Sequence, residues 1–134
     1  MSRIIVTGGS GLVGKHLQEI LPDAKYLSSK DCDLTDIKMV RWMISSYTPD
    51  IVIHLAAKVG GIQDNIKYPA DYFDDNVLMS TNILKVCKEY DVKRFVGILS
   101  TCIYPNIVET YPMSEEDLFI GPPPPTNFSY AFAK

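Results

Sequence analysis

Short apolar runs recur along the first hundred residues and are separated by more polar segments. Residues 3–7 are mostly β-branched, and Ile51–Leu55 and Phe95–Leu99 are two further continuous apolar runs. Runs of this length are typical of parallel strands that are buried on both faces. A briefer apolar stretch at Ala24–Ser28 predicts one more strand, so the pattern predicts four strands.

Three segments between these runs carry apolar residues at helical intervals. The first is Lys15–Leu21, the second begins after Asp36, which fits an N-cap, and ends before Pro49, and the third runs from Asp71 to about Tyr90. Strands that alternate with helices in this way predict an α/β fold, an open and doubly wound parallel sheet.

The periodicity fades in the last third of the chain. A loop with several prolines is expected from Pro105 to Phe128, and Ser114–Asp117 within it predicts a capping-box turn. Helical spacing resumes at Tyr130–Lys134, a segment too short to form a stable helix alone. We therefore expect residues 1–134 to be an incomplete domain, with Phe95–Leu99 exposed as an edge strand.

Composition limits the kind of partner. Hydrophobic residues make up 46% and charged residues 22% of the chain, as in ordinary globular domains, and the formal net charge is −3. Lysine and arginine are scattered, which argues against binding to nucleic acid or to an acidic membrane surface. Cys32, Cys87 and Cys102 form no CxxC or Cys/His pattern, so we expect no metal site and a reducing, cytoplasmic location. No targeting or membrane segment is visible near the start.

Three glycines follow the first strand at intervals of three. Gly8, Gly11 and Gly14 stand between that strand and the first helix. Glycines there permit a tight turn and close backbone approach, and the helix N-terminus offers free N–H groups to a pyrophosphate. The pattern favours dinucleotide binding of the Rossmann kind, and the alternative is a glycine-rich turn without a ligand.

The end of the second strand bears on which dinucleotide is bound. Ser28, Ser29 and Lys30 supply two hydroxyls and an ammonium group, which suit a ribose 2′-phosphate and favour NADPH. The alternative is a solvated loop lysine. Asp33, just before Leu34, could accept a hydrogen bond from the adenine amino group, although an aspartate in a turn more often caps its own backbone.

Tyr130 and Lys134 are four positions apart and would share one face of a helix. An isolated pair of this kind would be read as a surface tyrosine over a lysine stem. Here it accompanies other stretches that together resemble the extended short-chain dehydrogenase/reductases. These stretches are TGGSGLVG at 7–14, KDCDLTD at 30–36, HLAAKVGG at 54–61, NIKYPADYFDDN at 65–76, LSTCIYP at 99–105 and NFSYAFAK at 127–134.

The resemblance implies roles for four residues in catalysis. Tyr130 and Lys134 match the family's YxxxK pair, and Ser100 matches its catalytic serine. An unperturbed phenol has a pKa near ~10, and we expect the Lys134 ammonium and an oxidised nicotinamide to lower it. Tyr130 would protonate a carbonyl oxygen that Ser100 also contacts, while Lys134 would reach the nicotinamide ribose.

Cys102 lies in the STCIYP stretch, which together with KVGG is particular to one branch of the family. That branch epimerises GDP-4-keto-6-deoxymannose at C3 and C5 and then reduces C4 with NADPH, and a cysteine at this position works with a histidine beyond the YxxxK lysine. The alternative for Cys102 is a small buried hydrophobe. His16 and His54 are predicted on a helix and in a strand, so neither fits the acid–base partner.

The resemblance also implies a cofactor site and a pocket edge. Lys58–Gly61 would shape the nicotinamide end of the pocket, or would simply form a tight strand exit. The expected NADP(H) contacts are Gly8, Gly11, Leu12, Val13, Gly14, Ser28, Ser29, Lys30, Asp33, Leu34, Ala56, Ala57, Tyr130 and Lys134.

The whole pattern predicts an NADP-dependent oxidoreductase and epimerase that acts on a GDP-sugar. Residues 1–134 would be its amino-terminal cofactor-binding part, without the substrate domain and with little activity alone. The family also implies a homodimer through the helix at 71–90, or packing of that helix on its own sheet. The alternatives are a non-catalytic dinucleotide-binding fragment and another nucleotide-sugar epimerase or dehydratase.

Overall fold

The computed structural model describes residues 2–108 and 111–134, and its contacts divide them into two compact units. The sheet unit comprises the chain up to Ala57 together with Leu78–Ile98. The loop unit comprises Lys58–Val77 and Leu99–Lys134. Each unit is described by itself.

A four-stranded parallel sheet forms the centre of the sheet unit. Its strands are β1 (Ile4–Thr7), β2 (Lys25–Leu27), β3 (Ile51–His54) and β4 (Arg94–Gly97), in the order β2-β1-β3-β4. The chain thus starts in the interior of the sheet and winds outward in both directions. This is the doubly wound α/β topology, so the predicted fold and the four predicted strands are confirmed.

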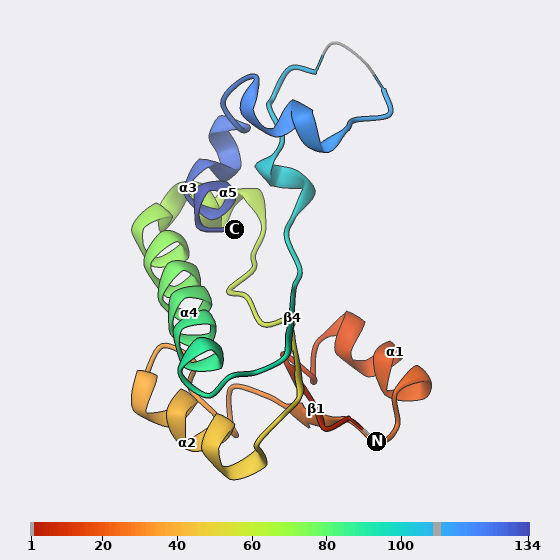
Figure 1. The fold of residues 1–134 in the computed structure, drawn as a ribbon. Helices are drawn as coiled ribbons and strands as arrows, with labels where there is room; N and C mark the ends of the chain where they lie inside the picture. The colour runs from red at the N-terminus through yellow and green to blue at the C-terminus, as the bar shows by residue number, and fades with distance from the viewer. Residues whose placement is uncertain (1, 109–110) are drawn as a thin grey trace. The chain divides into compact units, whose positions relative to one another are not determined.

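Helices cover both faces of this sheet. Helix α1 (Leu12–Ile20) and helix α2 (Ile37–Tyr47) lie on opposite sides of the strands (Figure 1). Helix α2 begins where predicted, because the Asp36 carboxylate accepts a hydrogen bond from the Lys38 backbone N–H at 2.8 Å. It ends at Thr48, whose φ of 42° is left-handed, directly before Pro49.

The main core lies on the α2 side of the sheet. Ile5 of β1 and Val52 of β3 pack there, with exposed fractions of 1% and 0%. Helix α4 (Pro69–Glu89) adds Ile83 and Val86, which are both fully buried. The other core members are Leu27, Cys32, Leu34, Val40, Met43, Ile44 and Cys87. The predicted packing of the long helix on its own sheet is therefore present.

Strand β4 is an edge strand, as expected. Val96 is 38% exposed, and Ile98, which follows the strand, is 46% exposed. Leu78 and Leu84 of α4 are also exposed, because they stand on the side of the helix away from Ile83 and Val86. The sheet unit thus carries apolar surface on both of these elements.

Short helices and loops make up the loop unit. They are α3 (Ile62–Lys67), the first residues of α4, α5 (Phe128–Ala133), and the 3₁₀ turns η1 (Thr101–Ile103), η2 (Glu115–Phe119) and η3 (Pro125–Asn127). The predicted capping box is present at η2, where the Asp117 carboxylate accepts from the Ser114 N–H at 2.7 Å. Residues 109 and 110 of the predicted loop lie outside the described residues.

Helix α3 is not predicted by the sequence pattern. Its two isoleucines, Ile62 and Ile66, are 54% and 56% exposed, and its buried side chain is that of Asn65. A helix that turns its apolar residues outward lacks the inward stripe by which helices are found in a sequence.

Candidate functional site

The glycine turn of the sheet unit is built for close backbone approach. Gly8 has a φ of +73°, and a Cβ there would lie 2.7 Å from the Ala56 nitrogen. A Cβ at Gly14 would lie 2.6 Å from the carbonyl oxygen of Gly9. The turn between β1 and α1 therefore requires glycine at both positions.

The N-terminus of α1 is open. Its N-cap residue is Gly11, which has no side chain to satisfy the first N–H groups, and the next two residues, Leu12 and Val13, are 78% and 57% exposed. Free N–H groups at an exposed helix start are a binding site for phosphate. The glycine turn and the start of α1 thus fit the pyrophosphate of a dinucleotide.

Ser28 is already engaged at the end of β2. Its hydroxyl donates to Asp31 Oδ2 at 2.6 Å, and its backbone N–H donates to the same oxygen at 2.7 Å. These bonds lower the pKa of Asp31, so a carboxylate stands beside the segment predicted to read a 2′-phosphate. Ser29 and Lys30 lie in the same exposed turn, and the Lys30 N–H points to the Ser28 hydroxyl at 3.3 Å. The Ser28 proton would have to leave Asp31 before it could meet a phosphate.

Asp33 adopts the backbone-capping role left open by the sequence. Its Oδ1 accepts from the Thr35 N–H at 2.9 Å and from the Thr35 hydroxyl at 2.7 Å. The next residue, Leu34, is buried, and its carbonyl accepts from Asn82 Nδ2 of α4 at 3.0 Å. Asn82 also donates to the Thr35 carbonyl at 2.9 Å, so one buried amide fixes this loop to α4.

The residues after β3 are the last of the predicted cofactor contacts in the sheet unit. Ala56 and Ala57 are half-buried, and the Ala56 backbone stands where a side chain at Gly8 would project. His54 is buried within β3, and its Nδ1 lies 2.8 Å from the Thr7 hydroxyl at the matching position of β1. His16 lies on α1 with its Nδ1 2.9 Å from the Leu12 carbonyl. Both histidines occupy the elements predicted for them.

The loop unit brings a serine, a thiol and a phenol together. The Ser100 hydroxyl accepts from the Cys102 N–H at 3.2 Å and interacts with the Tyr130 hydroxyl. Asn127 Nδ2 donates to Cys102 Sγ at 3.3 Å. Helix α5 packs against η1, which places Tyr130 beside the Ser100–Cys102 turn. Three residues predicted from the sequence therefore gather in one unit.

Burial controls the ionisation of Tyr130 and Lys134. Burial raises the pKa of Tyr130, while the Ser100 hydroxyl acts in the opposite direction and Cys102 adds to the rise. Burial also lowers the pKa of Lys134. Among the chain's own groups desolvation of the phenol dominates, and the lowering of this pKa by Lys134 together with an oxidised nicotinamide stays a prediction. At neutral pH the phenol is therefore protonated.

The Lys58–Gly61 turn is held in place by three side chains of the loop unit. Asn76, which is 1% exposed, accepts from the Lys58 N–H at 2.9 Å and donates to the Lys58 carbonyl at 3.0 Å. Asn65 donates to the carbonyls of Gly60 and Gly61 at 3.2 and 3.0 Å. The Tyr72 hydroxyl fills the place of a side chain at Gly60.

The Lys58 side chain is also fixed. Its ammonium group forms an ion pair with Asp75 at 2.6 Å, and this contact raises the pKa of Lys58. The ammonium also lies 5.6 Å from the centre of the Tyr72 ring. The turn is thus ordered and carries a charged side chain at its start.

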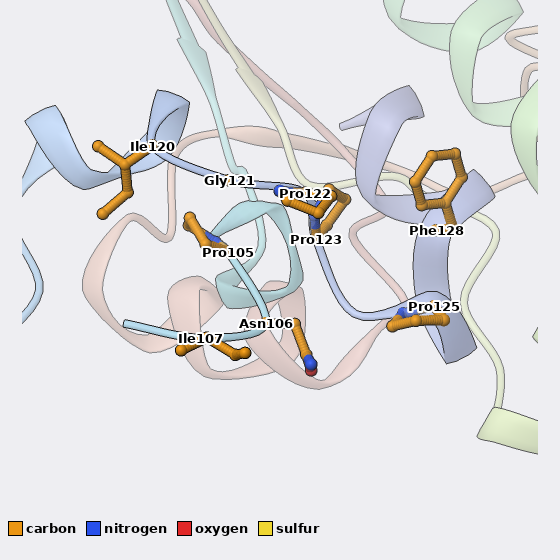
Figure 2. Close-up of a pocket in the computed structure, with 9 residues that line it drawn as sticks. All are labelled: Pro105, Asn106, Ile107, Ile120, Gly121, Pro122, Pro123, Pro125 and Phe128. Atoms are coloured by element: carbon orange, nitrogen blue, oxygen red, sulfur yellow. The ribbon is translucent and has the colours of Figure 1, made fainter. Parts of the chain in front are cut away.

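A cavity of about 580 Å³ lies elsewhere in the loop unit. Figure 2 shows residues 105–107 facing the 120–125 segment across it, with Phe128 at one end. Its walls include Pro105, Ile120, Pro122, Pro123, Pro125 and Phe128. None of the described residues that line this cavity is ionisable, whereas the Ser100–Cys102–Tyr130 group of the same unit contains a thiol and a phenol.

Two residues of these groups were not found by sequence reasoning. Asn127 belongs to the NFSYAFAK stretch but was given no role of its own, and Asn76 belongs to the long helix.

Among the described residues, no three His, Cys, Asp or Glu side chains are grouped so as to hold a metal ion. None of the helices in residues 2–108 and 111–134 is long and apolar enough to cross a membrane.

Comparisons with known proteins point to one family. The model of the NAD dependent epimerase/dehydratase family matches residues 4–134. A GDP-L-fucose synthase of Dictyostelium discoideum is 41% identical, over 98% of this chain and 43% of the relative. A probable GDP-L-fucose synthase of Drosophila melanogaster is 37% identical, over 100% of this chain and 44% of the relative.

A solved structure agrees with these relatives. The GDP-L-fucose synthetase from Naegleria fowleri bound to NADP is 42% identical and superposes with a TM-score of 0.88, over 99% of this chain and 44% of that one. The chain therefore spans less than half the length of the relatives that it matches.

Proposed function

Because the chain belongs to the NAD dependent epimerase/dehydratase family, we propose that it binds NADPH and serves in the conversion of GDP-4-keto-6-deoxy-D-mannose to GDP-L-fucose. The relatives named GDP-L-fucose synthase support this choice within the family. The observation that carries the proposal is the grouping of Ser100, Cys102 and Tyr130 in the loop unit. A simple reductase needs the serine and the phenol, whereas epimerisation also needs a base such as the thiol.

The sheet unit fits the cofactor. Gly8 and Gly14 leave a backbone cradle that a Cβ would fill, and the start of α1 would hold the pyrophosphate. Ser29 and Lys30 would bind the 2′-phosphate, together with Ser28 once its hydroxyl leaves Asp31. When bound, NADPH supplies the hydride that reduces C4. Leu12, Val13, Asp33, Leu34, Ala56 and Ala57 would line the same site.

Tyr130 is proposed as the acid of the reduction. A phenol carries its proton at pH 7, and burial raises the pKa of Tyr130 further, so this residue can donate its proton to the C4 oxygen as that oxygen gains negative charge. Ser100 would donate a hydrogen bond to the same oxygen. Lys134 would hold the ribose of the cofactor, a role for which its position one turn after Tyr130 is suitable.

Cys102 is proposed as the base of the epimerisation. Its thiolate would remove a proton from C3 or C5, each of which is acidified by the neighbouring C4 ketone, and a proton returned to the opposite face would complete the inversion. The His16 ring lies within hydrogen-bonding distance of the Leu12 carbonyl, and the His54 ring within hydrogen-bonding distance of the Thr7 hydroxyl. Neither histidine is therefore proposed as the acid that returns the proton to the sugar. A longer protein would supply that acid and the sugar-gripping domain.

The partners of the chain are proposed on the same basis. The substrate would be a GDP-sugar, the protein would act in the cytoplasm, and two copies would pair as a homodimer. Leu78 and Leu84 on α4, which are 46% and 50% exposed, support an interface on this helix. Residues 1–134 would form the cofactor-binding domain and would turn over little substrate alone.

The test is a titration of the purified chain with NADPH and with NADH, followed by nicotinamide fluorescence. We expect saturable binding that is tighter for NADPH. A second measurement adds GDP-4-keto-6-deoxymannose to a longer form of the protein and follows NADPH consumption and product. Stoichiometric NADPH loss with formation of GDP-L-fucose supports the proposal, because an epimerase or dehydratase that regenerates its cofactor would consume none. Tighter binding of NADH, or a product made without NADPH loss, would exclude it.

A further inference from the structure

Asn127 makes an unusual choice of partner. It is the N-cap residue of α5, where asparagine normally turns its side chain onto the first N–H groups of the helix, yet here its side chain makes no cap hydrogen bond. Its Nδ2 instead donates to Cys102 Sγ at 3.3 Å, across 25 positions of sequence. The chain thus forgoes a cap worth about 1 kcal/mol in typical helices in order to place a donor on a sulfur atom.

The thiol is held from two directions. Ser100 fixes the Cys102 backbone through a 3.2 Å bond to its N–H, and Asn127 fixes the sulfur itself. Asn127 is in turn anchored within η3, where its backbone N–H donates to the Pro124 carbonyl at 3.0 Å. The direction of the sulfur therefore depends on the side chain of Asn127.

The elements around the sulfur carry few ionisable groups. Helix α5 packs against η1 and η3, whose ionisable groups together with those of α5 are Cys102 and Tyr130. Lys134 follows α5, and α3, which packs against η3, carries Asp64 and Lys67. Asn127 supplies the hydrogen bond that the sulfur accepts, and such a bond is stronger when the acceptor carries negative charge.

We infer that Asn127 is a positioning residue for Cys102, which orients the sulfur and donates a hydrogen bond to it for proton transfer. This inference rests on the proposed function, in which Cys102 removes the protons at C3 and C5. Asn127 and the proposed acid Tyr130 lie one helical turn apart at the start of α5. The residue that positions the base of the epimerisation and the acid of the reduction therefore belong to one segment.

Alkylation of Cys102 by iodoacetamide tests the inference without any sugar substrate. The other thiols, Cys32 and Cys87, are 3% and 5% exposed, and burial raises the pKa of each to about 11. At pH 7 the reagent should therefore modify Cys102, which peptide mass spectrometry can verify. The rate is measured at pH 7 and at pH 10 in the parent chain, Asn127→Ala and Asn127→Asp, with Asn106→Ala as the matched control in the same unit.

We expect both Asn127 variants to react about five- to ten-fold more slowly than the parent at pH 7, with the rates converging at pH 10. Asn127→Ala carries the comparison, because it adds no charge beside the sulfur and removes no cap bond from α5, whereas the carboxylate of Asn127→Asp would itself repel negative charge on the sulfur. Unchanged or faster reaction of Asn127→Ala at pH 7, or equal slowing in Asn106→Ala, overturns the inference. NADPH titration of the same variants does not depend on Asn127 orienting the Cys102 sulfur. If the parent chain failed to bind NADPH, that result would count against the proposed function and not against this inference.

Discussion

Replacing Gly8 by alanine should destabilise the chain and weaken NADPH binding. The φ of +73° at Gly8 costs an alanine about 1–2 kcal/mol. The new Cβ would also lie 2.7–2.9 Å from the Ala56 nitrogen, the Ala56 Cα and the Leu55 carbonyl carbon. These are backbone atoms and cannot rotate away, so the chain after β3 must move, at a further cost of about 1–3 kcal/mol.

Together these terms predict a loss of about 2–5 kcal/mol in the free energy of unfolding. For a chain of this length each kcal/mol corresponds to about 3–5 °C in melting temperature, so we expect a fall of about 6–25 °C. Thermal unfolding is followed by circular dichroism, and NADPH binding is measured well below the transition. Binding should weaken because the same shift opens the turn that precedes α1.

Gly61→Ala is the matched control. A Cβ at Gly61 would meet nothing within 4 Å, and its φ of −70° suits any residue. This variant should melt within about 2 °C of the parent, as ordinary surface substitutions do. The steric argument is refuted if Gly8→Ala melts as the parent does, or if Gly61→Ala is destabilised to the same extent.

Three further predictions concern other parts of the chain. Asn82→Ala leaves two loop carbonyls without their amide donor, so the free energy of unfolding measured in urea should fall by about 2–3 kcal/mol. Asn106→Ala, at an exposed position, is the control. A similar loss in this control would show that Asn82 has no special role. The Lys93 ammonium and the Arg3 N–H hold the pKa of Asp50 at about 2, below its unfolded value, so Asp50 stabilises the fold above about pH 4. That contribution is lost as the pH falls toward 2, so the melting temperatures of the parent and Asp50→Asn should converge there; a constant difference would contradict this. Lys30→Ala should weaken NADPH binding about two- to five-fold and leave NADH binding unchanged, and equal loss for both would show that Lys30 does not read the 2′-phosphate.

Local features of the fold could be predicted because the sequence determines them locally. Asp36 caps α2 through a bond to a residue two positions away, and the continuous apolar run that begins at Ile51 forms β3 in the interior of the sheet. Helix α3 could not be predicted, because Ile62 and Ile66 face outward and Asn65 faces inward. The period of apolar residues carries no signal in such a helix.

The candidate site was predictable in its residue types but not in its contacts. The family motifs place Ser100, Cys102 and Tyr130, whereas the bond from Asn127 to the sulfur exists only after η3 and η1 have packed. The Ser28 hydroxyl was expected to bind a phosphate, but in the structure it donates to the carboxylate of Asp31, three residues further on. The burial that raises the pKa of Tyr130 is likewise a property of the folded chain and cannot be seen in the sequence.

The Tyr72 hydroxyl lies where a side chain at position 60 would project, so we expect positions 60 and 72 to vary together. Any side chain at 60 would overlap that hydroxyl, and with phenylalanine at 72 the nearest ring carbon would still lie 2.9 Å from a Cβ. Gly60→Ala and Tyr72→Phe should therefore show a favourable coupling in a double-mutant cycle. Across related sequences, a residue larger than glycine at 60 should be found where tyrosine at 72 has been replaced, so the history of one position constrains the other.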